Sequence, residues 1–406
     1  MMTRPFFFLF FTAGLIFVAF AQVYLLCKLY RFLQTSRLHP RLRQILFGTV
    51  GALVALMYLP YPLRLIYKWP EHEVSVLVLY GLLYPFSLWG MASVSTFLIV
   101  LLKDVGSAVY RVWKPPSPPP RVPDVRLRGS PLATRREFLR WTFGAVAVSP
   151  AGVFAYGAAV GKEHYEIVEH TMLLPRLSPR LHGLRIVQLT DIHVGNFMKQ
   201  DKLERYVRVV NDLQPDIVAL TGDFIGSSPH FIPACAAALE KIEAREGVFA
   251  CLGNHDYWVG AHSVADALER AGVRVLRNEA QTLTLKGAVL NIAGVDDPWR
   301  GKPDFDRALS MIDANVPTIM LCHQPDLFPA SAQRAVDLML SGHYHGGQVK
   351  LQFMGMKLSP AHLISGFVEG HYRQGPSQLY VSRGIGTTGP PVRLNAPPEI
   401  TLLHLA

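Results

Sequence analysis

Between residues 191 and 345 the chain carries five short clusters of carboxylate, imidazole and carboxamide side chains, which can bind metal ions through oxygen and nitrogen. No cluster contains a cysteine, so the ligand set differs from that of closed thiolate sites. Ligands of this kind suit manganese, iron, zinc or similar ions at an open site that also holds water. In chain order the clusters are Asp191-Ile192-His193, Gly222-Asp223, Gly253-Asn254-His255-Asp256, His323 and Gly342-His343-Tyr344-His345.

Each cluster directly follows a short apolar run that is typical of a buried β-strand. The expected strands cover residues 184–189, 216–220, 248–252, 289–293, 318–321 and 336–340. Helices are expected at Leu203–Leu213, Cys235–Ala244 and Ser263–Ala271, the last with Ser263 as its N-cap. Strands that alternate with helices predict βαβ units, and ligands gather beyond the carboxyl ends of such strands. The five clusters are therefore expected to converge on one pocket.

From about Leu184 to Leu405 the sequence resembles the calcineurin-like metallophosphoesterases, because all five clusters match motifs of that superfamily. The segment Ser382–Gly386 and the strand Pro398-Glu399-Ile400-Thr401 resemble those of a membrane-anchored bacterial group, transmembrane proteins with a metallophosphoesterase domain. The resemblance implies an α/β fold in which a two-sheet sandwich is flanked by helices. It also implies a hydrolase that acts on a phosphomonoester, a phosphodiester or a pyrophosphate.

The resemblance further implies a role for each residue at a centre of two divalent metal ions, with manganese among the candidates. Seven residues would be ligands: for one ion Asp191, His193 and His345, for the other Asn254, His323 and His343, and as a bridge Asp223. The ions would activate hydroxide for attack on phosphorus. His255 would stabilise or protonate the leaving oxygen, Asp256 would orient His255, and the amide nitrogen of Asn254 would meet the phosphate.

The N-terminal part of the chain is strongly apolar. Half of all residues are hydrophobic and mean hydropathy is positive, which is high for a soluble protein. The surplus lies in four uncharged runs, at residues 5–27, 44–63, 74–102 and 141–161. The first and third can cross roughly 30 Å of hydrocarbon as helices. The second is marginal, its helix being expected to stop near Leu59 before two prolines, and the fourth is weakly apolar. We expect an all-α membrane region of about four transmembrane helices.

The positive charge of the chain lies in the same N-terminal part. The net charge is +10, yet residues 162–406 hold 23 Lys and Arg against 25 Asp and Glu, while residues 1–161 hold 17 against 5. The near-neutral catalytic part makes nucleic acid an unexpected partner. Basic residues gather at 28–43 and 103–140, and the positive-inside rule places both loops in the cytoplasm. With four spans we expect a multi-pass protein of a bacterial inner membrane, its catalytic domain on the periplasmic, extracytoplasmic side.

The expected organisation has four parts. Residues 1–112 form a membrane region with three transmembrane helices, 113–134 a Pro-rich basic linker, 135–162 a twin-arginine-like segment with a fourth membrane helix, and 163–406 the metallophosphoesterase domain. The stretch around Arg135-Arg136 resembles a twin-arginine export signal, which makes that export machinery a candidate partner. It fits the basic flank of a membrane helix equally well. Gly157-Ala158-Ala159 fits either a cleavage site or a retained anchor.

Two other functions stay open at this point. Related membrane-linked proteins are associated with UDP-2,3-diacylglucosamine pyrophosphohydrolysis in lipid A biosynthesis. That lipid-linked substrate is met on the cytoplasmic side, which conflicts with the expected topology. A non-catalytic membrane scaffold or sensor could instead keep the metal site for structure or for ligand detection.

Several residues outside the five clusters also carry expectations. Arg383 is a candidate contact for substrate phosphate, and Asp296–Arg300 is a candidate rim of the pocket. The apolar stretch Phe353–Phe367 is expected to pack in the core rather than to form a membrane-facing rim. All four cysteines are expected to be small, buried core residues: Cys27, Cys235, Cys251 and Cys322.

Overall fold

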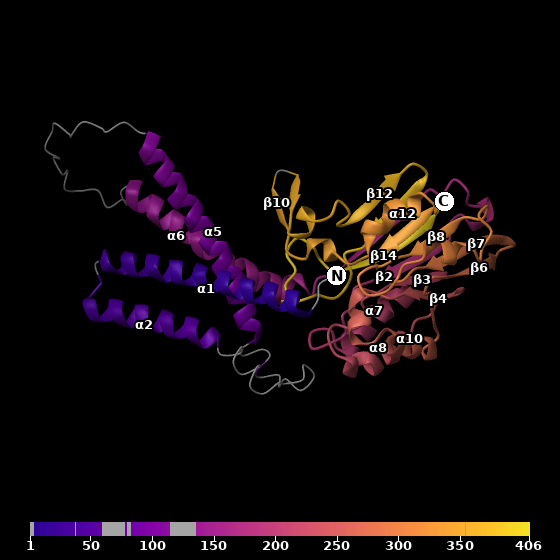
Figure 1. Cartoon of the computed structure of the whole chain (residues 1–406), viewed down its shortest axis with the longest axis horizontal. Helices are drawn as coiled ribbons and strands as arrows, with labels where there is room; N and C mark the ends of the chain where they lie inside the picture. The colour runs from indigo at the N-terminus through magenta and orange to yellow at the C-terminus, as the bar shows by residue number, and fades with distance from the viewer. Residues whose placement is uncertain (1–3, 37, 59–77, 79–82, 114–134, 354) are drawn as a thin grey trace. The chain divides into compact units, whose positions relative to one another are not determined.

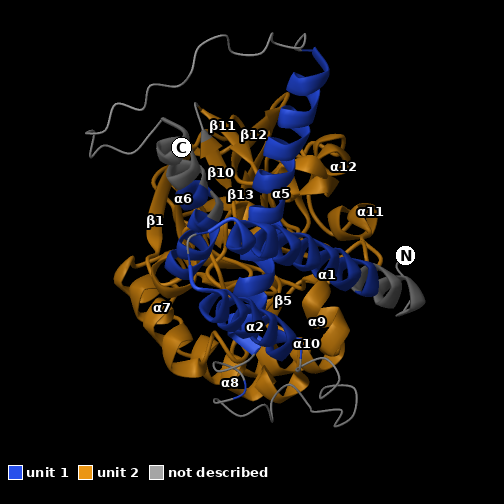
Figure 2. Cartoon of the chain, turned by 90° about the vertical axis from the view of Figure 1, so that its left-hand side faces the viewer, with its two compact units in different colours: residues 1–69, 74–156 blue, residues 70–73, 157–406 orange. Residues whose placement is uncertain are grey.

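The computed structural model describes residues 4–36, 38–58, 78, 83–113, 135–353 and 355–406 (Figure 1). The chain divides into two compact units, which Figure 2 colours separately. The first comprises residues 1–69 and 74–156, and the second comprises residues 70–73 and 157–406. The expected linker at 113–134, apart from Trp113 at the end of a helix, lies outside the described residues, and so does the expected helix end near Leu59.

The first unit is helical, as expected for a membrane region. Its helices are α1 (Arg4–Gln34), α2 (Pro40–Met57), α5 (Tyr84–Trp113) and α6 (Arg135–Tyr156). In the described part of the chain, three stretches are long and apolar enough to cross a membrane: Thr12–Gln34, Tyr84–Trp113 and Gly144–Gly161. Helix α2 has 18 residues, and two of its first four are Arg41 and Arg43. Its full length is about 27 Å at 1.5 Å per residue, so its apolar part is shorter than the hydrocarbon layer.

Helices α1 and α5 of the first unit pack through one buried aromatic side chain. The ring of Phe97 lies edge-on to three rings of α1, with centroids 5.2 to 5.9 Å away: Phe17, Phe20 and Tyr24. A buried hydrogen bond from Gln22 Nε2 to Ser93 Oγ (3.3 Å) joins the same helices. The carboxylate of Asp104 contacts both Tyr24 and Lys28. The polar groups of these helices thus find partners within the helix pair, as apolar surroundings require.

The second unit contains two six-stranded mixed sheets and a separate hairpin. The order of the first sheet is β1 (Glu166–Met172), β14 (Glu399–Leu405), β2 (Arg185–Leu189), β3 (Ile217–Thr221), β4 (Gly247–Cys251), β5 (Val273–Val275). The order of the second is β12 (Gly370–Gln374), β13 (Ser377–Val381), β9 (Leu338–Ser341), β8 (Thr318–Leu321), β7 (Ala288–Gly294), β6 (Glu279–Leu285). Strands β2, β3 and β4 run parallel, as do β7, β8 and β9. The hairpin is β10 (Leu351–Phe353) with β11 (Met356–Leu358).

The core of the second unit has three layers, which follow from the alternation of side chains along the strands. Inward residues of both sheets, such as Ile217, Phe249 and Ile319, form the middle layer. The opposite face of the first sheet packs against α7 (Gln200–Asp212), α8 (Ile232–Leu239) and α10 (Ala261–Arg270). The opposite face of the second packs against α11 (Phe305–Leu309) and α12 (Phe328–Ala332). Figure 1 shows α8 and α12 on opposite sides of the sheets. The expected two-sheet sandwich flanked by helices is confirmed.

Some local expectations are wrong. The helix expected at Cys235–Ala244 ends at Leu239, and the one expected from Ser263 begins at Ala261. Its N-cap is Gly260, whose φ of 125° separates it from the short helix α9 (Asn254–Val259). A glycine tolerates this angle because it has no Cβ. Cys27 is exposed in the first unit, whereas the other three cysteines are buried as expected.

The second unit begins at Gly157, six residues before the boundary expected from sequence. Helix α6 continues as a π-helical turn, η3 (Gly157–Gly161). Gly157 and Ala158 are buried, and the Gly157 carbonyl accepts a hydrogen bond from the backbone N–H of Arg393 (3.2 Å). A Cβ on Gly161 would lie 2.1 Å from the Arg393 carbonyl oxygen, so only glycine fits this approach. The turn that ends the candidate span is thus part of the packing of the catalytic unit.

Candidate metal centre

Strand ends bring the five clusters together, as the sequence predicts. Asp191 follows β2 and Asp223 follows β3 in the first sheet, whereas His323 follows β8 and His343 follows β9 in the second. Asn254 opens helix α9 directly after β4. Because these strands are parallel within each sheet, their carboxyl ends lie at the same edge. The two sheets therefore contribute ligands to one site from opposite sides of the sandwich.

The backbone of the site is strained at the residues that carry metal-binding side chains. Five of them have left-handed φ angles between 51° and 74°: Asp191, His193, Asp223, His343 and His345. Non-glycine residues rarely adopt this region, and such strain gathers at functional sites when the surroundings enforce it. The loops enforce it on each other, because the N–H of Asp191 donates to Gly222 O and the N–H of His193 to Asp223 O, both at 3.0 Å.

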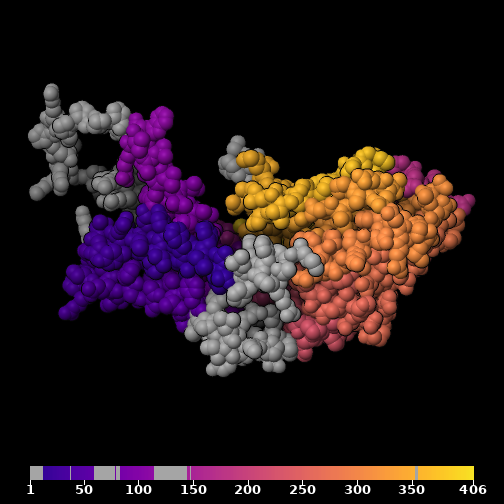
Figure 3. Space-filling model, in the orientation of Figure 1, coloured from indigo at the N-terminus to yellow at the C-terminus, as the bar shows by residue number. Residues whose placement is uncertain are grey.

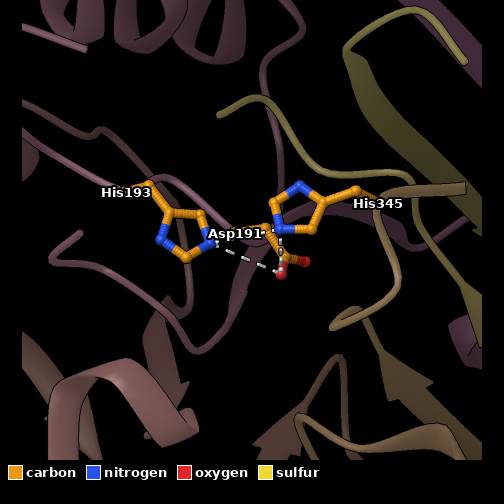
Figure 4. Close-up of side chains that lie close together, drawn as sticks. All are labelled: Asp191, His193 and His345. Carbon is orange, nitrogen blue, oxygen red and sulfur yellow. Dashed lines mark hydrogen bonds and ion pairs between the residues drawn. The ribbon is translucent and has the colours of Figure 1, made fainter. Parts of the chain in front are cut away.

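Asp191, His193 and His345 form the first group that could hold a metal ion (Figure 4). The Nε2 atoms of His193 and His345 are 3.2 Å apart. His345 Nε2 lies 3.3 Å from Asp191 Oδ1, and His193 Nε2 lies 4.0 Å from the same oxygen. Thr190 Oγ1 (3.0 Å) and the N–H of His343 (3.0 Å) donate to Asp191 Oδ2. These donors hold the carboxylate toward the two imidazoles.

Asp223 belongs to the two other groups that could hold a metal ion. One contains His323 and His343, and the other contains His193 and His255. Asp223 Oδ2 lies 3.2 Å from His323 Nε2 and 3.5 Å from His193 Nε2. His323 Nε2 is in turn 3.2 Å from His343 Nδ1. One carboxylate is therefore shared between two clusters of imidazoles.

The donor set fits a pair of divalent cations. The Oδ1 atom of Asn254 is buried beside these clusters and has no hydrogen-bond partner among the described residues, which suits a metal-facing oxygen. Burial lowers the pKa of His193 and of His343 to about 3, and that of His345 well below its usual value. Their imidazoles are therefore neutral at pH 7 and keep lone pairs for a metal.

Two backbone carbonyls set the tautomers of further imidazoles. A carbonyl only accepts, so His323 donates its Nδ1–H to Thr221 O (2.8 Å) and presents Nε2 to the site. His255 donates its Nδ1–H to Gly226 O (2.5 Å), which leaves its Nε2 free. The ring of His255 lies 4.6 Å from that of His193. The contact that orients His255 is thus Gly226 O, and the orienting role expected of Asp256 is wrong.

Asp256 instead ties together the loops that follow β3 and β4. Its buried carboxylate accepts four backbone N–H bonds of 2.8 to 3.2 Å, from Asp223, Phe224, Ile225 and Gly253. Only glycine fits at position 253, because a Cβ there would lie 2.3 Å from Asp223 Oδ1. Asp256 is therefore a positioning residue for Asp223 rather than a group that meets substrate.

Arg393 is the residue at the site that sequence reasoning missed. It is fully buried, and its guanidinium donates to the carbonyls of Gly384, Gly386 and Ala396 (2.6 to 3.0 Å). Its Nη2 lies 3.3 Å from His345 Nδ1. Burial lowers its pKa to about 10, so the group is a cation beneath the first group of ligands. No sequence pattern marks it, since its acceptors are backbone carbonyls that only the folded loop gathers.

Arg383 does not have the free guanidinium expected of a phosphate contact. Its Nε donates to Glu399 Oε2 (2.6 Å) and its Nη2 to Glu166 Oε2 (2.8 Å). Two carboxylates therefore neutralise it, and it joins β1, β14 and the loop after β13.

Two tryptophans form the rim of the site. The ring of Trp299 lies 4.8 Å from that of His343, and the ring of Trp258 lies 4.2 Å from that of His255. Both indoles are about half exposed. Asp297 shapes this rim, because its Oδ1 accepts the N–H of Trp299 (2.9 Å) and of Arg300 (3.2 Å). The expectation that Asp296–Arg300 borders the pocket agrees with this geometry.

Fold and site together define a class: an α/β two-sheet sandwich with a carboxylate- and imidazole-rich candidate metal site at the ends of its strands. Residues 184–347 match the family model of the calcineurin-like phosphoesterases. The metallophosphoesterase YkuE of Bacillus subtilis is 35% identical over 282 residues, which are 67% of this chain and 97% of that protein. The chain belongs to the metallophosphoesterase family, whose members are phosphoester hydrolases with a dinuclear metal centre.

Two further relatives differ in name and in coverage. The phosphodiesterase YaeI of Escherichia coli is 29% identical over 279 residues, which are 68% of this chain and all of that protein. A transmembrane protein with metallophosphoesterase domain from Danio rerio is 30% identical over 296 residues, which are 69% of this chain and 66% of that protein.

Replacing Asp256 by asparagine should weaken metal binding without removing a ligand. The carboxamide nitrogen cannot accept the N–H bonds that hold Asp223, so we expect metal affinity to fall about 10- to 100-fold. Calorimetric titration of the full chain with Mn²⁺ measures this, with Asp313→Asn as the control because Asp313 is exposed and its carboxylate bonds only to Asn315. Equal affinities in both variants would contradict the positioning role.

Metal binding should release protons in a pH-dependent way. Burial opposes protonation of His323, but Asp223 outweighs it and raises its pKa to about 10. Burial raises the pKa of Asp191 to about 6. Metal must displace the His323 proton at any pH below 10, so log affinity should rise by about one per pH unit between pH 6.5 and 8.5, and more steeply below pH 6. Calorimetry in buffers of different ionisation enthalpy checks both slopes, and a pH-independent affinity would contradict the assignment.

Proposed function

We propose that the chain is a membrane-anchored phosphoesterase that works with two divalent metal ions. Asp191, His193 and His345 would hold one ion, and Asn254, His323 and His343 the other, with Asp223 shared. The single observation that carries this proposal is the sharing of Asp223 between two clusters of imidazoles. A carboxylate has two oxygens and can serve two cations, whereas an imidazole has one free lone pair.

The side chains around this centre suit hydrolysis of a phosphoester. A pair of divalent ions supplies Lewis acidity toward phosphoryl oxygens and makes a nearby water more acidic. His255 is fixed at Nδ1 by Gly226 O, so its Nε2 is the atom that would hand a proton to the leaving oxygen. The amide nitrogen of Asn254 would donate to a phosphoryl oxygen. The rings of Trp258 and Trp299 at the rim would flank the leaving group and restrict water.

A phosphodiester is the ester class that we propose first. The support is the relative named as a phosphodiesterase. The match covers the whole length of that relative and 68% of this chain. Manganese is the ion that we propose to supply, because oxygen and imidazole ligands without thiolate suit it. Hydrolysis of a lipid-linked pyrophosphate such as UDP-2,3-diacylglucosamine would use the same residues, but needs a cytoplasmic catalytic unit. A scaffold or sensor would not need the free Nε2 of His255.

We further propose that α2 also crosses the membrane, as the second of four spans in chain order. The catalytic unit would then face away from the cytoplasm. The support is charge: if only the three longer stretches span, the basic segments at 28–43 and 103–140 fall on opposite sides of the membrane. With α2 included they share one side, as the positive-inside rule requires. A bacterial inner membrane with a periplasmic catalytic unit is the location that follows.

The segment before the catalytic unit is proposed to be a retained anchor. Arg135 and Arg136 open α6, where a twin-arginine signal and a basic membrane flank share the same pattern. Gly157 and Ala158, at the candidate cleavage site, are buried against the Val392–Arg393 segment. A peptidase needs an extended, accessible chain, so burial favours retention.

The enzymatic proposal is tested on the full chain in detergent micelles, loaded with Mn²⁺. Bis(p-nitrophenyl) phosphate should be hydrolysed faster than p-nitrophenyl phosphate. Asp223→Asn should lower kcat at least about 1000-fold, because the shared ligand is lost. His255→Gln should lower it about 100- to 10,000-fold with metal content unchanged, since a proton donor is lost. His230→Gln is the control, because His230 is exposed and belongs to none of the metal-capable groups.

Turnover that survives both substitutions would contradict the proposal. Two bound metals without turnover of either ester would instead favour the lipid-linked pyrophosphate or the sensor function.

The topology is tested by reporter fusions in a bacterial host. We expect a C-terminal fusion to alkaline phosphatase to be active and one to green fluorescent protein to be dark, because the C-terminus lies outside. A fusion after Leu38, in the first basic loop, should give the opposite pair of results. A fluorescent C-terminal fusion would overturn the four-span topology and remove the objection to a cytoplasmic lipid A precursor.

A further inference from the structure

We propose that the β10–β11 hairpin and the turn after it contact the lipid bilayer directly. The apolar hairpin face consists of five large side chains, with exposed fractions of 51 to 76%: Leu351, Met356, Leu358, Leu363 and Ile364. The last two belong to the 3₁₀ turn η8 (Ala361–Leu363) and its C-cap. The expectation that Phe353–Phe367 packs in the core is therefore wrong for most of this stretch. Among the large apolar side chains described in this stretch, Phe367 follows it, since it packs against the outer core of the second sheet.

A hairpin folded onto a protein core points its apolar face inward. In this hairpin the apolar face points outward. In the register of the hairpin Leu351 pairs with Leu358 and Gln352 with Lys357, so apolar and polar pairs point to opposite faces. The polar pair, Gln352 and Lys357, lines a pocket of about 530 Å³ on the inner side. The apolar pair points away from the unit. Figure 1 shows β10 standing clear of the two sheets, and the same segment projects from the surface in Figure 3.

Ion pairs, rather than apolar packing, hold the hairpin in place. Lys350, at its base, lies 2.6 Å from both carboxylate oxygens of Glu369, and Lys357 of β11 lies 2.7 Å from Oε1. Ser359 Oγ and His362 Nδ1 are 2.7 Å apart in the turn that follows. The apolar hairpin face is thus presented on a fixed support and takes no part in stabilising the unit. Contiguous exposed apolar surface of this kind marks a site of interaction.

The bilayer is the occupant that the chain itself indicates. The candidate span Gly144–Gly161 ends in the turn η3, and Gly157 O accepts the N–H of Arg393. The next residue, Leu394, exchanges backbone hydrogen bonds with Gln348 (2.9 Å) and Lys350 (3.0 Å), and Lys350 directly precedes β10. The Arg393-Leu394 segment is therefore hydrogen-bonded both to the turn at the end of the candidate span and to the base of the hairpin. These contacts all lie within the second unit.

The charge of the segment agrees with a lipid surface. No Asp or Glu occurs between Asp337 and Glu369, while Lys350 directly precedes the hairpin and Lys357 lies within β11. A segment that enters the boundary between head groups and acyl chains needs apolar side chains and must avoid carboxylates. A lipid contact would also hold the metal centre near the bilayer, because β10 begins six residues after His345. That consequence for a lipid-linked substrate rests on the proposed function, whereas the contact itself does not.

The test is the lipid exposure of a probe on the hairpin, in the full chain reconstituted into nanodiscs of phosphatidylethanolamine and phosphatidylglycerol. In a Cys27→Ser background, Met356→Cys carries an environment-sensitive NBD label. Met311→Cys is the matched control, because Met311 is equally exposed (61% against 68%) but belongs to the loop after α11. We expect blue-shifted emission at position 356 and at least threefold stronger quenching by lipids with spin-labelled acyl chains than at position 311.

Equal quenching at the two positions would overturn the proposal. So would a blue shift at 356 without lipid quenching, which would mean that protein covers the hairpin. A disulfide-linked dimer of the unlabelled Met356→Cys chain would assign the hairpin to self-association instead. Adding Leu363→Glu and Ile364→Glu should reduce the quenching at 356 while the thermal midpoint of the unit stays unchanged. Fluorescence needs neither metal nor turnover, so this result stands apart from any failure of the proposed catalysis.

Discussion

The catalytic unit depends on one electrostatic constraint: two buried carboxylates lie within 4.0 Å of the same imidazole nitrogen and must be neutralised. Asp191 and Asp223 both face His193 Nε2, and neither has bulk water to stabilise its charge. Burial and the negative charge of Asp223 raise the pKa of Asp191, whereas the positive charge of His323 holds the pKa of Asp223 well below its usual value despite burial. Like charges at this separation need cations between or beneath them. A pair of divalent ions meets that need, and Arg393 adds a fixed positive charge from below.

The backbone adopts unfavourable φ angles to keep these groups together, and a network of hydrogen bonds holds it in that conformation. Five left-handed residues carry the side chains of the centre, and each such residue costs of order 1–3 kcal/mol. The carboxylate of Asp256 offsets part of this by accepting four backbone N–H groups from the loops after β3 and β4. Glycines at 253 and 342 leave room for the two carboxylates, since a Cβ at either would lie within 2.3 Å of a carboxylate oxygen. Rigidity is therefore built into the protein before any ligand binds.

One residue, Arg393, joins the metal centre to the turn η3 of the second unit. The backbone N–H of Arg393 donates to Gly157, its side chain gathers the carbonyls of the loop after β13, and its Nη2 lies beside His345. The residue that follows it pairs with the base of the β10–β11 hairpin. The turn η3, the base of the hairpin and His345 are thus linked by contacts within the second unit.

The sequence by itself determined the five clusters, their placement after apolar strands, the alternation of strands and helices and the helical N-terminal region, and the two-sheet sandwich came from its resemblance to a known family. It could do so because strand alternation and ligand chemistry are local properties of the chain. It gave Asp256 the wrong partner, could not decide the role of Arg383 and overlooked Arg393, because the partners of these residues are backbone N–H groups, carbonyls and carboxylates that lie far away along the chain. It also placed Phe353–Phe367 in the core, since apolar composition alone does not say which face of a hairpin turns outward. Only the tertiary structure decided those points: hydrogen-bond partners and exposure are set by the packing of distant segments, and not by any neighbour in sequence.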